Sequence, residues 1–144
     1  MLEDLYQELI LDHNQHPHHY GELPGYTHTA HGHNPLCGDE LDLYLVIENN
    51  HIKDIRFIGE GCAISKASAS IMTDELVGKT LEEATEIFED FHSLLTEEGS
   101  QGLKLQKAGV FSGVREFPIR VKCATLAWHT FSEAKSSCIC TAAV

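Results

Sequence analysis

The sequence predicts a compact α/β (α+β) fold, a single domain in which helices pack against a small antiparallel β-sheet. A chain of 144 residues with 42% hydrophobic and 22% charged residues has the size and composition of one globular domain with one core. Residues 40–48 alternate apolar and polar side chains, as a half-buried strand does. Apolar residues near both ends of the chain recur instead at helical spacing, which predicts the helices that cover the sheet.

The first half of the chain predicts a helix, a loop and a hairpin. Residues 2–13 carry a stripe of leucine, isoleucine and tyrosine at helical spacing. Residues 15–36 contain three prolines and three glycines without periodicity, which predicts a long loop that is functional or mobile. Residues 40–48 and 51–58 are predicted strands, and the Asn-Asn pair between them suits a turn because asparagine tolerates positive φ.

The second half predicts three helices separated by an irregular stretch. Residues 63–77 are rich in small side chains and favour a helix, which Gly78 is suited to end. The next helix opens at Thr80-Leu-Glu-Glu, a capping box in which the hydroxyl and the last glutamate each accept from a free amide. Residues 98–117 predict irregular structure, and a proline at 118 suits the first turn of a last helix that runs to about 135.

The domain is predicted to cover residues 1–135, with 136–144 as a flexible C-terminal tail. The first ten residues are acidic and amphipathic, unlike a signal peptide. No stretch approaches the roughly 18 apolar residues of a membrane span. We therefore expect a cytoplasmic protein that does not associate with a membrane.

The charge of the chain excludes one class of partner. The formal net charge is −12, from 22 acidic and 10 basic residues. Binding to nucleic acid through phosphate contacts needs clustered lysine and arginine, so we expect no nucleic-acid partner. A basic protein partner is compatible with this charge.

Five cysteines are the main candidates for chemistry: Cys37, Cys62, Cys123, Cys138 and Cys140. An odd number of cysteines in a chain without a secretion signal argues against a disulfide framework. Reactive thiols, metal ligands and plain buried residues all stay possible on this basis.

The first three cysteines each lie at a predicted junction of secondary structure, so they can converge on one point. Cys37 precedes a strand, Cys62 begins a helix and Cys123 falls in the first turns of the last helix. The unpaired amides of a helix N-terminus lower the pKa of a nearby thiol. Arg120 and Lys122 would add positive charge beside Cys123.

Asp39 lies two residues after Cys37, across a single glycine. Three thiolates and one carboxylate make a ligand set that tetrahedral zinc accepts, and thiolates also suit an iron–sulfur cluster. Alternatively, Asp39 caps a turn or pairs with a base, and the cysteines are small buried hydrophobic residues. Spacing alone leaves these alternatives open, because the separations match no short zinc motif.

Four stretches of the sequence carry a resemblance to a known family. They are YQELILDHNQHP, NPLCGD, GEGCAISKASASIM and RVKCATLAW, in this order. Over roughly residues 3–132 the chain resembles the U-type iron–sulfur cluster assembly proteins (SufU, IscU and the NifU N-terminal domain), and within them the SufU branch. The resemblance implies a SufE/NifU-like fold. In IscU-type scaffolds a histidine precedes the third cysteine, whereas this chain has Lys122.

The resemblance also implies a site and a reaction. Cys37, Asp39, Cys62 and Cys123 fall on the metal and sulfur positions of the family, with Zn²⁺ as the expected cofactor. The implied activity is that of a zinc-dependent sulfurtransferase that accepts persulfide sulfur from a PLP-dependent, SufS-like cysteine desulfurase and supplies downstream Suf or other cluster assembly proteins. We expect Cys37 to accept the sulfur, since its loop is the most mobile of the three settings, with Arg120 and Lys122 as further catalytic candidates. The alternative is a scaffold on which a [2Fe–2S] cluster is assembled and transferred to apo-proteins.

Two further features lie outside this set. Seven of the ten histidines fall between His13 and His33, which suggests a second metal site or, as the favoured interpretation, a polar solvated loop. Cys138 and Cys140 follow the region of resemblance. They would relay sulfur, bind metal or, as we favour, belong to a frayed tail.

Overall fold

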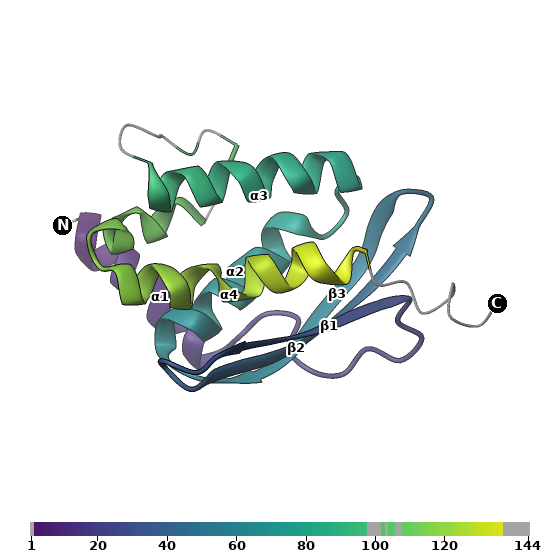
Figure 1. Cartoon of the computed structure of the whole chain (residues 1–144), viewed down its shortest axis with the longest axis horizontal. Helices are drawn as coiled ribbons and strands as arrows, with labels where there is room; N and C mark the ends of the chain where they lie inside the picture. The colour runs from purple at the N-terminus through teal and green to yellow at the C-terminus, as the bar shows by residue number, and fades with distance from the viewer. Residues whose placement is uncertain (1, 98–101, 103, 106–107, 137–144) are drawn as a thin grey trace.

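The computed structural model describes residues 2–97, 102, 104, 105 and 108–136, with side chains from residue 7 onward. Its elements, in chain order, are α1 (Leu2–Gln15), β1 (His28–Asn34), β2 (Asp39–Glu48), β3 (His51–Glu60), α2 (Ala63–Leu76), α3 (Leu81–Thr96), the 3₁₀ helix η1 (Ala108–Glu116) and α4 (Pro118–Ala134). Figure 1 shows the helices gathered on one side of the sheet. The predicted α+β class is therefore confirmed.

The sheet is antiparallel, in the order β1-β2-β3. β2 buries Leu41, Leu43 and Leu45 on the helix side, as its alternating pattern predicts. The turn to β3 consists of Asn49 and Asn50, both with positive φ, at 51° and 64°. This confirms the predicted Asn-Asn hairpin.

The predicted long loop over 15–36 is wrong in its second half, where β1 forms from 28 to 34. β1 lacks the alternation of apolar and polar residues that indicates a half-buried strand, because small and polar residues occupy its inward positions. At one of these, Gly32, an added Cβ would lie 2.1 Å from Thr130 Oγ1 on α4. Glycine thus lets α4 lie almost directly on the strand, and the usual apolar signal of a buried strand is missing.

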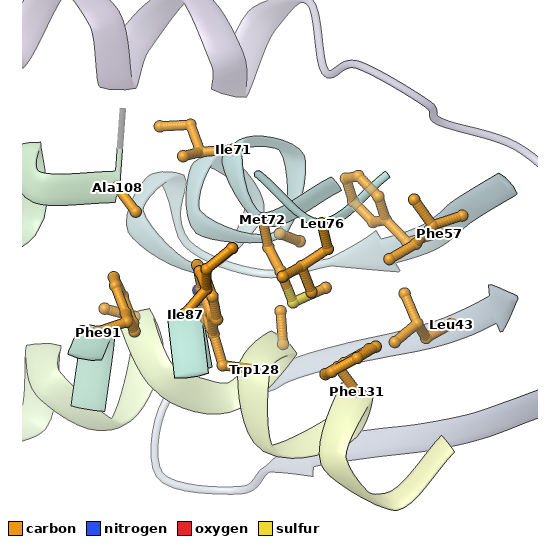
Figure 2. Close-up of a cluster of buried hydrophobic side chains, with 14 of the residues drawn as sticks. Leu43, Phe57, Ile71, Met72, Leu76, Ile87, Phe91, Ala108, Trp128 and Phe131 are labelled. Atoms are coloured by element: carbon orange, nitrogen blue, oxygen red, sulfur yellow. The ribbon is translucent and has the colours of Figure 1, made fainter. Parts of the chain in front are cut away.

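α2 and α4 lie between the sheet and α3 and pack buried residues of the core against both (Figures 1 and 2). The Trp128 ring stacks on Phe91 of α3, with centroids 4.2 Å apart and planes 12° apart. Trp128 Nε1 donates to the buried Ser68 Oγ on α2 at 3.1 Å. The small residues of α2 thus allow α4 to pack closely against it.

The signals that bound the helices behave largely as predicted. Thr80 and Glu83 form the capping box of α3, Pro118 stands at the start of α4, and Gly78 takes a positive φ of 82° just after α2. The irregular structure predicted for 98–117 is wrong over 108–116, where η1 forms. Its buried residues recur every third position, the period of a 3₁₀ helix rather than of an α-helix.

No helix in the described ranges is both long and apolar enough to cross a membrane. Residues 137–144, with Cys138 and Cys140, lie outside the described residues. The domain boundary at 135 and the proposed tail therefore stay predictions.

Candidate metal centre

Cys37 lies on the four-residue turn that joins β1 to β2. The turn is closed by a hydrogen bond from the Cys37 backbone N–H to the Asn34 carbonyl, at 3.3 Å. Gly38 follows with a φ of 69°, a conformation that glycine adopts without strain. Leu36, beside the thiol, is 68% exposed. The Cys37 thiol is half-buried and borders on solvent.

Asp39 is the first residue of β2 and is fully buried. Its Oδ1 accepts a hydrogen bond from the Cys62 backbone N–H at 2.9 Å. Cys62 is the N-cap of α2, and its sulfur accepts from Ser65 N at 3.4 Å, as expected for a thiol at a helix N-terminus. The Cys62 sulfur lies 3.9 Å from Asp39 Oδ2.

Cys123 lies in the second turn of α4 and is 3% exposed. Its sulfur lies 3.0 Å from the Cys37 sulfur. Ligand atoms of Cys37, Asp39 and Cys123 all lie within 4.8 Å of one another, although 86 residues separate the two cysteines. We call these three residues together with Cys62 the thiol site. The turn, the start of β2, the start of α2 and α4 thus bring the four predicted residues together, with Cys62 at the edge of the group.

The electrostatics of Cys123 differ from the expectation. Burial raises the pKa of its thiol far above the ordinary value, and hydrogen bonds with the neighbouring thiols and the carboxylate act in the same direction. A lowered pKa near the N-terminus of α4 is therefore wrong for the protein without a bound cation. The cause is that Cys123 is buried in the second turn, where it also contacts groups that favour the protonated thiol.

The donor set of the thiol site fits a zinc ion. A fully buried carboxylate and two adjoining thiols are costly to ionise together unless a cation lies among them. Zinc favours four-coordinate sites of this kind and binds thiols as thiolates. Cys37, Asp39 and Cys123 would hold the ion, and Cys62, 3.9 Å from the carboxylate, is the remaining donor.

Arg120 and Lys122 are exposed on α4, three residues and one residue before Cys123. The Arg120 guanidinium lies 5.1 Å from the centre of the Phe117 ring. Among the described contacts, neither cation bonds to a thiol of the site. They place positive charge on the exposed surface of α4, and their catalytic role stays a prediction.

Sequence reasoning gave no role to Asn34. It is buried at the end of β1, its Nδ2 points to the Cys123 sulfur at 4.0 Å, and its Oδ1 accepts from Leu36 N at 3.2 Å. Asn34 therefore ties the Cys37 turn to α4. The available signal was the Asn-Pro pair that opens the motif, which is typical of a turn start.

Gly61 provides a structural prediction for this site. It has a φ of 154°, and an added Cβ would lie 2.3 Å from Asp39 Oδ1. Gly61→Ala should therefore displace the carboxylate, lower the free energy of unfolding by about 1–3 kcal/mol and weaken zinc retention. Denaturant unfolding and zinc content measure both effects.

Gly25→Ala is the control for Gly61→Ala. Gly25 also has a positive φ, of 79°, but a Cβ there meets nothing within 4 Å. It should cost only backbone strain and leave zinc binding intact. Equal costs and equal zinc retention in the two variants would contradict the collision with Asp39.

The structure corrects in part the interpretation of the histidine-rich segment as a polar solvated loop, since some of its histidines are exposed and others are buried. His13 is 1% exposed at the end of α1, and His28 lies buried in β1. His13, His18 and Asp74 form a second group whose ligand atoms lie within 4.8 Å of one another. Contacts from distant elements decide this, and spacing in the sequence could not show it.

Comparison with known proteins identifies relatives over nearly the whole chain. The family model for the NifU-like N terminal domain matches residues 5–124. The chain is 40% identical to a Streptococcus pyogenes protein named iron-sulfur cluster assembly scaffold protein IscU, covering 92% of this chain and 84% of the relative. It is 37% identical to the Bacillus subtilis protein named zinc-dependent sulfurtransferase SufU, covering 92% and 90%.

A solved structure agrees with these relatives. A crystal structure from Fervidobacterium islandicum, described as an iron-sulfur cluster assembly scaffold protein for the SUF system, superposes with a TM-score of 0.85 at 32% identity. The match covers 92% of this chain and 97% of that one. Sequence and fold therefore point to the same group of proteins.

Proposed function

Because this chain belongs to the family of NifU-like N-terminal domains, we propose that it serves iron–sulfur cluster assembly as a zinc-dependent sulfurtransferase that accepts persulfide sulfur from a cysteine desulfurase. The observation that carries the proposal is the thiol site, where a half-exposed thiol adjoins a buried thiol and a buried carboxylate. The name of the Bacillus subtilis relative supports the zinc-dependent activity. We also propose that the protein acts in the cytoplasm.

Cys37 is the proposed sulfur acceptor. Its thiol is half-buried and lies on a turn, whereas Cys123 is buried, and the sulfur of Cys62, which is also half-buried, accepts a hydrogen bond at the start of α2. The Cys37 thiolate attacks the outer sulfur of the desulfurase persulfide. A sulfur–sulfur bond forms on Cys37, the sulfur–sulfur bond of the donor breaks, and the donor cysteine leaves as a thiolate. The transfer needs no external oxidant or reductant, since one persulfide replaces another.

Zinc, when bound, would keep the thiols of the site in the thiolate form at neutral pH. The residues of the chain supply the rest. Asp39 holds the start of α2 through the Cys62 N–H, and Asn34 holds the Cys37 turn. Arg120 and Lys122, exposed on α4, would attract the anionic persulfide.

A scaffold for a [2Fe–2S] cluster is the second candidate function. The relative from Streptococcus pyogenes is named a scaffold, and the same cysteines would serve as cluster ligands. Lys122, in place of the histidine of IscU-type scaffolds, supports the sulfurtransferase instead. In either function the product would reach other cluster assembly proteins or apo-proteins.

Metal analysis of the purified full chain, after dialysis against a mild chelator, separates the two functions. For the sulfurtransferase we expect about one zinc per chain and neither iron nor acid-labile sulfide. Iron and sulfide in equal amounts, with a brown protein, would contradict that proposal and support the scaffold. Anaerobic purification is the control that prevents loss of an oxygen-sensitive cluster.

A further inference from the structure

A second cluster of metal-ligating side chains lies on α2, away from the thiols. It consists of His13 from the end of α1, His18 from the segment that follows, and Asp74 from α2, with ligand atoms within 4.8 Å of one another. Since an α-helix rises about 1.5 Å per residue, Asp74 lies roughly 18 Å along α2 from Cys62. The cluster, which we call the histidine site, is therefore distinct from the thiol site.

We propose that the histidine site binds a divalent transition ion, and that zinc is the ion it fits best. Two imidazoles and one carboxylate with an open fourth position make a common zinc arrangement. Zinc–ligand bonds of about 2.0–2.2 Å in a tetrahedron correspond to ligand–ligand distances of about 3.4 Å. Small side-chain rotations therefore suffice to close the group around an ion.

The histidines of this site are already held by hydrogen bonds from α2. Ser70 Oγ, fully buried, lies 2.7 Å from His13 Nδ1 and accepts from the His18 backbone N–H at 2.7 Å. When Ser70 also accepts from His13 Nδ1–H, His13 Nε2 is deprotonated and able to bind a metal. Metal-bound histidines ordinarily have such a partner on the other ring nitrogen.

Asp74 supplies the negative charge of the site. Its Oδ2 lies 2.7 Å from His18 Nδ1, and its Oδ1 lies 3.6 Å from Nδ1 of the neighbouring His19. The carboxylate is only 19% exposed. A divalent cation among an anion and neutral imidazoles would offset the cost of burying that charge. His19 adds a further imidazole beside this carboxylate.

The site also has a route for the ion. His13 is buried, whereas the His18 side chain is 41% exposed. An ion would meet His18 and Asp74 first and reach His13 last. Once bound, it would fasten the end of α1 and the segment around His18 to α2.

The test uses the full chain carrying Cys138→Ser and Cys140→Ser, which removes two thiols outside the thiol site. The thiol site is filled with zinc, and Co²⁺ is then titrated by calorimetry and absorption spectroscopy. We expect one further equivalent to bind without thiolate-to-cobalt charge-transfer bands. His18→Gln and Asp74→Asn should each weaken this equivalent by at least about tenfold, as loss of a ligand or its partner does.

His31 and Asp42 provide the matched control. They form an exposed pair of the same kind, with His31 Nδ1 2.8 Å from Asp42 Oδ1, on the sheet. The double variant His31→Gln/Asp42→Asn should bind the further Co²⁺ equivalent like the parent. Absence of this equivalent in the parent, or its retention in His18→Gln and Asp74→Asn, would overturn the proposal.

A stability measurement covers the case in which the variants unfold more easily. Zn²⁺ beyond the first equivalent should raise the melting temperature of the parent and of the control, because the assembled site binds it more tightly than the unfolded chain does. It should not raise that of His18→Gln or Asp74→Asn. If the cluster is only a set of hydrogen bonds, the variants will lose stability and Zn²⁺ will shift none of the proteins, which also refutes the site.

Discussion

Cys37→Ser should abolish the uptake of sulfur from a cysteine desulfurase charged with isotopically labelled cysteine. The serine oxygen keeps the size of the side chain but is not a nucleophile toward a persulfide at neutral pH. The remaining thiols of the described site are a buried one and an N-cap, so neither replaces Cys37. The measurement is labelled sulfur on the chain after separation from the desulfurase, and we expect a reduction to background.

Two controls identify which cysteine accepts the sulfur. The double variant Cys138→Ser/Cys140→Ser should take up sulfur at the normal rate if the C-terminal thiols play no part. Mass spectrometry of the wild-type chain should locate the extra sulfur on the peptide that holds Cys37. Normal uptake by Cys37→Ser, or an extra sulfur on another cysteine of the wild type, would show that Cys37 is not the acceptor.

Asp39→Asn should strongly weaken zinc binding. In the wild type the Cys62 N–H donates to Asp39 Oδ1 at 2.9 Å. Asparagine keeps an oxygen that can accept this hydrogen bond, so the start of α2 stays in place. The buried negative charge is lost, however, and with it the carboxylate ligand. We expect the affinity to fall by more than the roughly 10–100-fold that loss of an outer-shell partner costs. Competition with a chromophoric chelator measures the change.

Asp42→Asn is the matched control for this experiment. Asp42 lies on the same strand three residues later, but its side chain is 50% exposed and pairs with His31 on the surface. Its substitution should leave zinc affinity unchanged. Equal affinities for the wild type and Asp39→Asn would mean that Asp39 is not a ligand and serves only to cap α2.

The elements that the sequence predicts correctly are those whose signal is local. The alternation of β2, the Asn-Asn turn and the Thr80 capping box each depend on residues within a few positions of one another. The sequence does not reveal β1, because its inward residues are suited to the close approach of α4, more than 80 residues later, rather than to a generic apolar core. η1 was missed because its buried residues follow the period of three.

The thiol site shows the same division. Motifs around the cysteines predict Cys37, Asp39, Cys62 and Cys123 as a set, and the fold brings them together. The raised pKa of Cys123 and the part played by Asn34 depend on burial and on neighbours from other elements. Neither property can be predicted from the spacing of residues along the chain.

The sequence by itself determined the fold class, the helix caps and the identity of the candidate ligands, because each depends on the types of residues that lie close together along the chain. The tertiary structure alone decided that Cys123 is buried while Cys37 and Cys62 are only half-buried. It also decided that His13 and His18 meet Asp74 on α2, since residues more than 50 positions apart come together only when the helices pack.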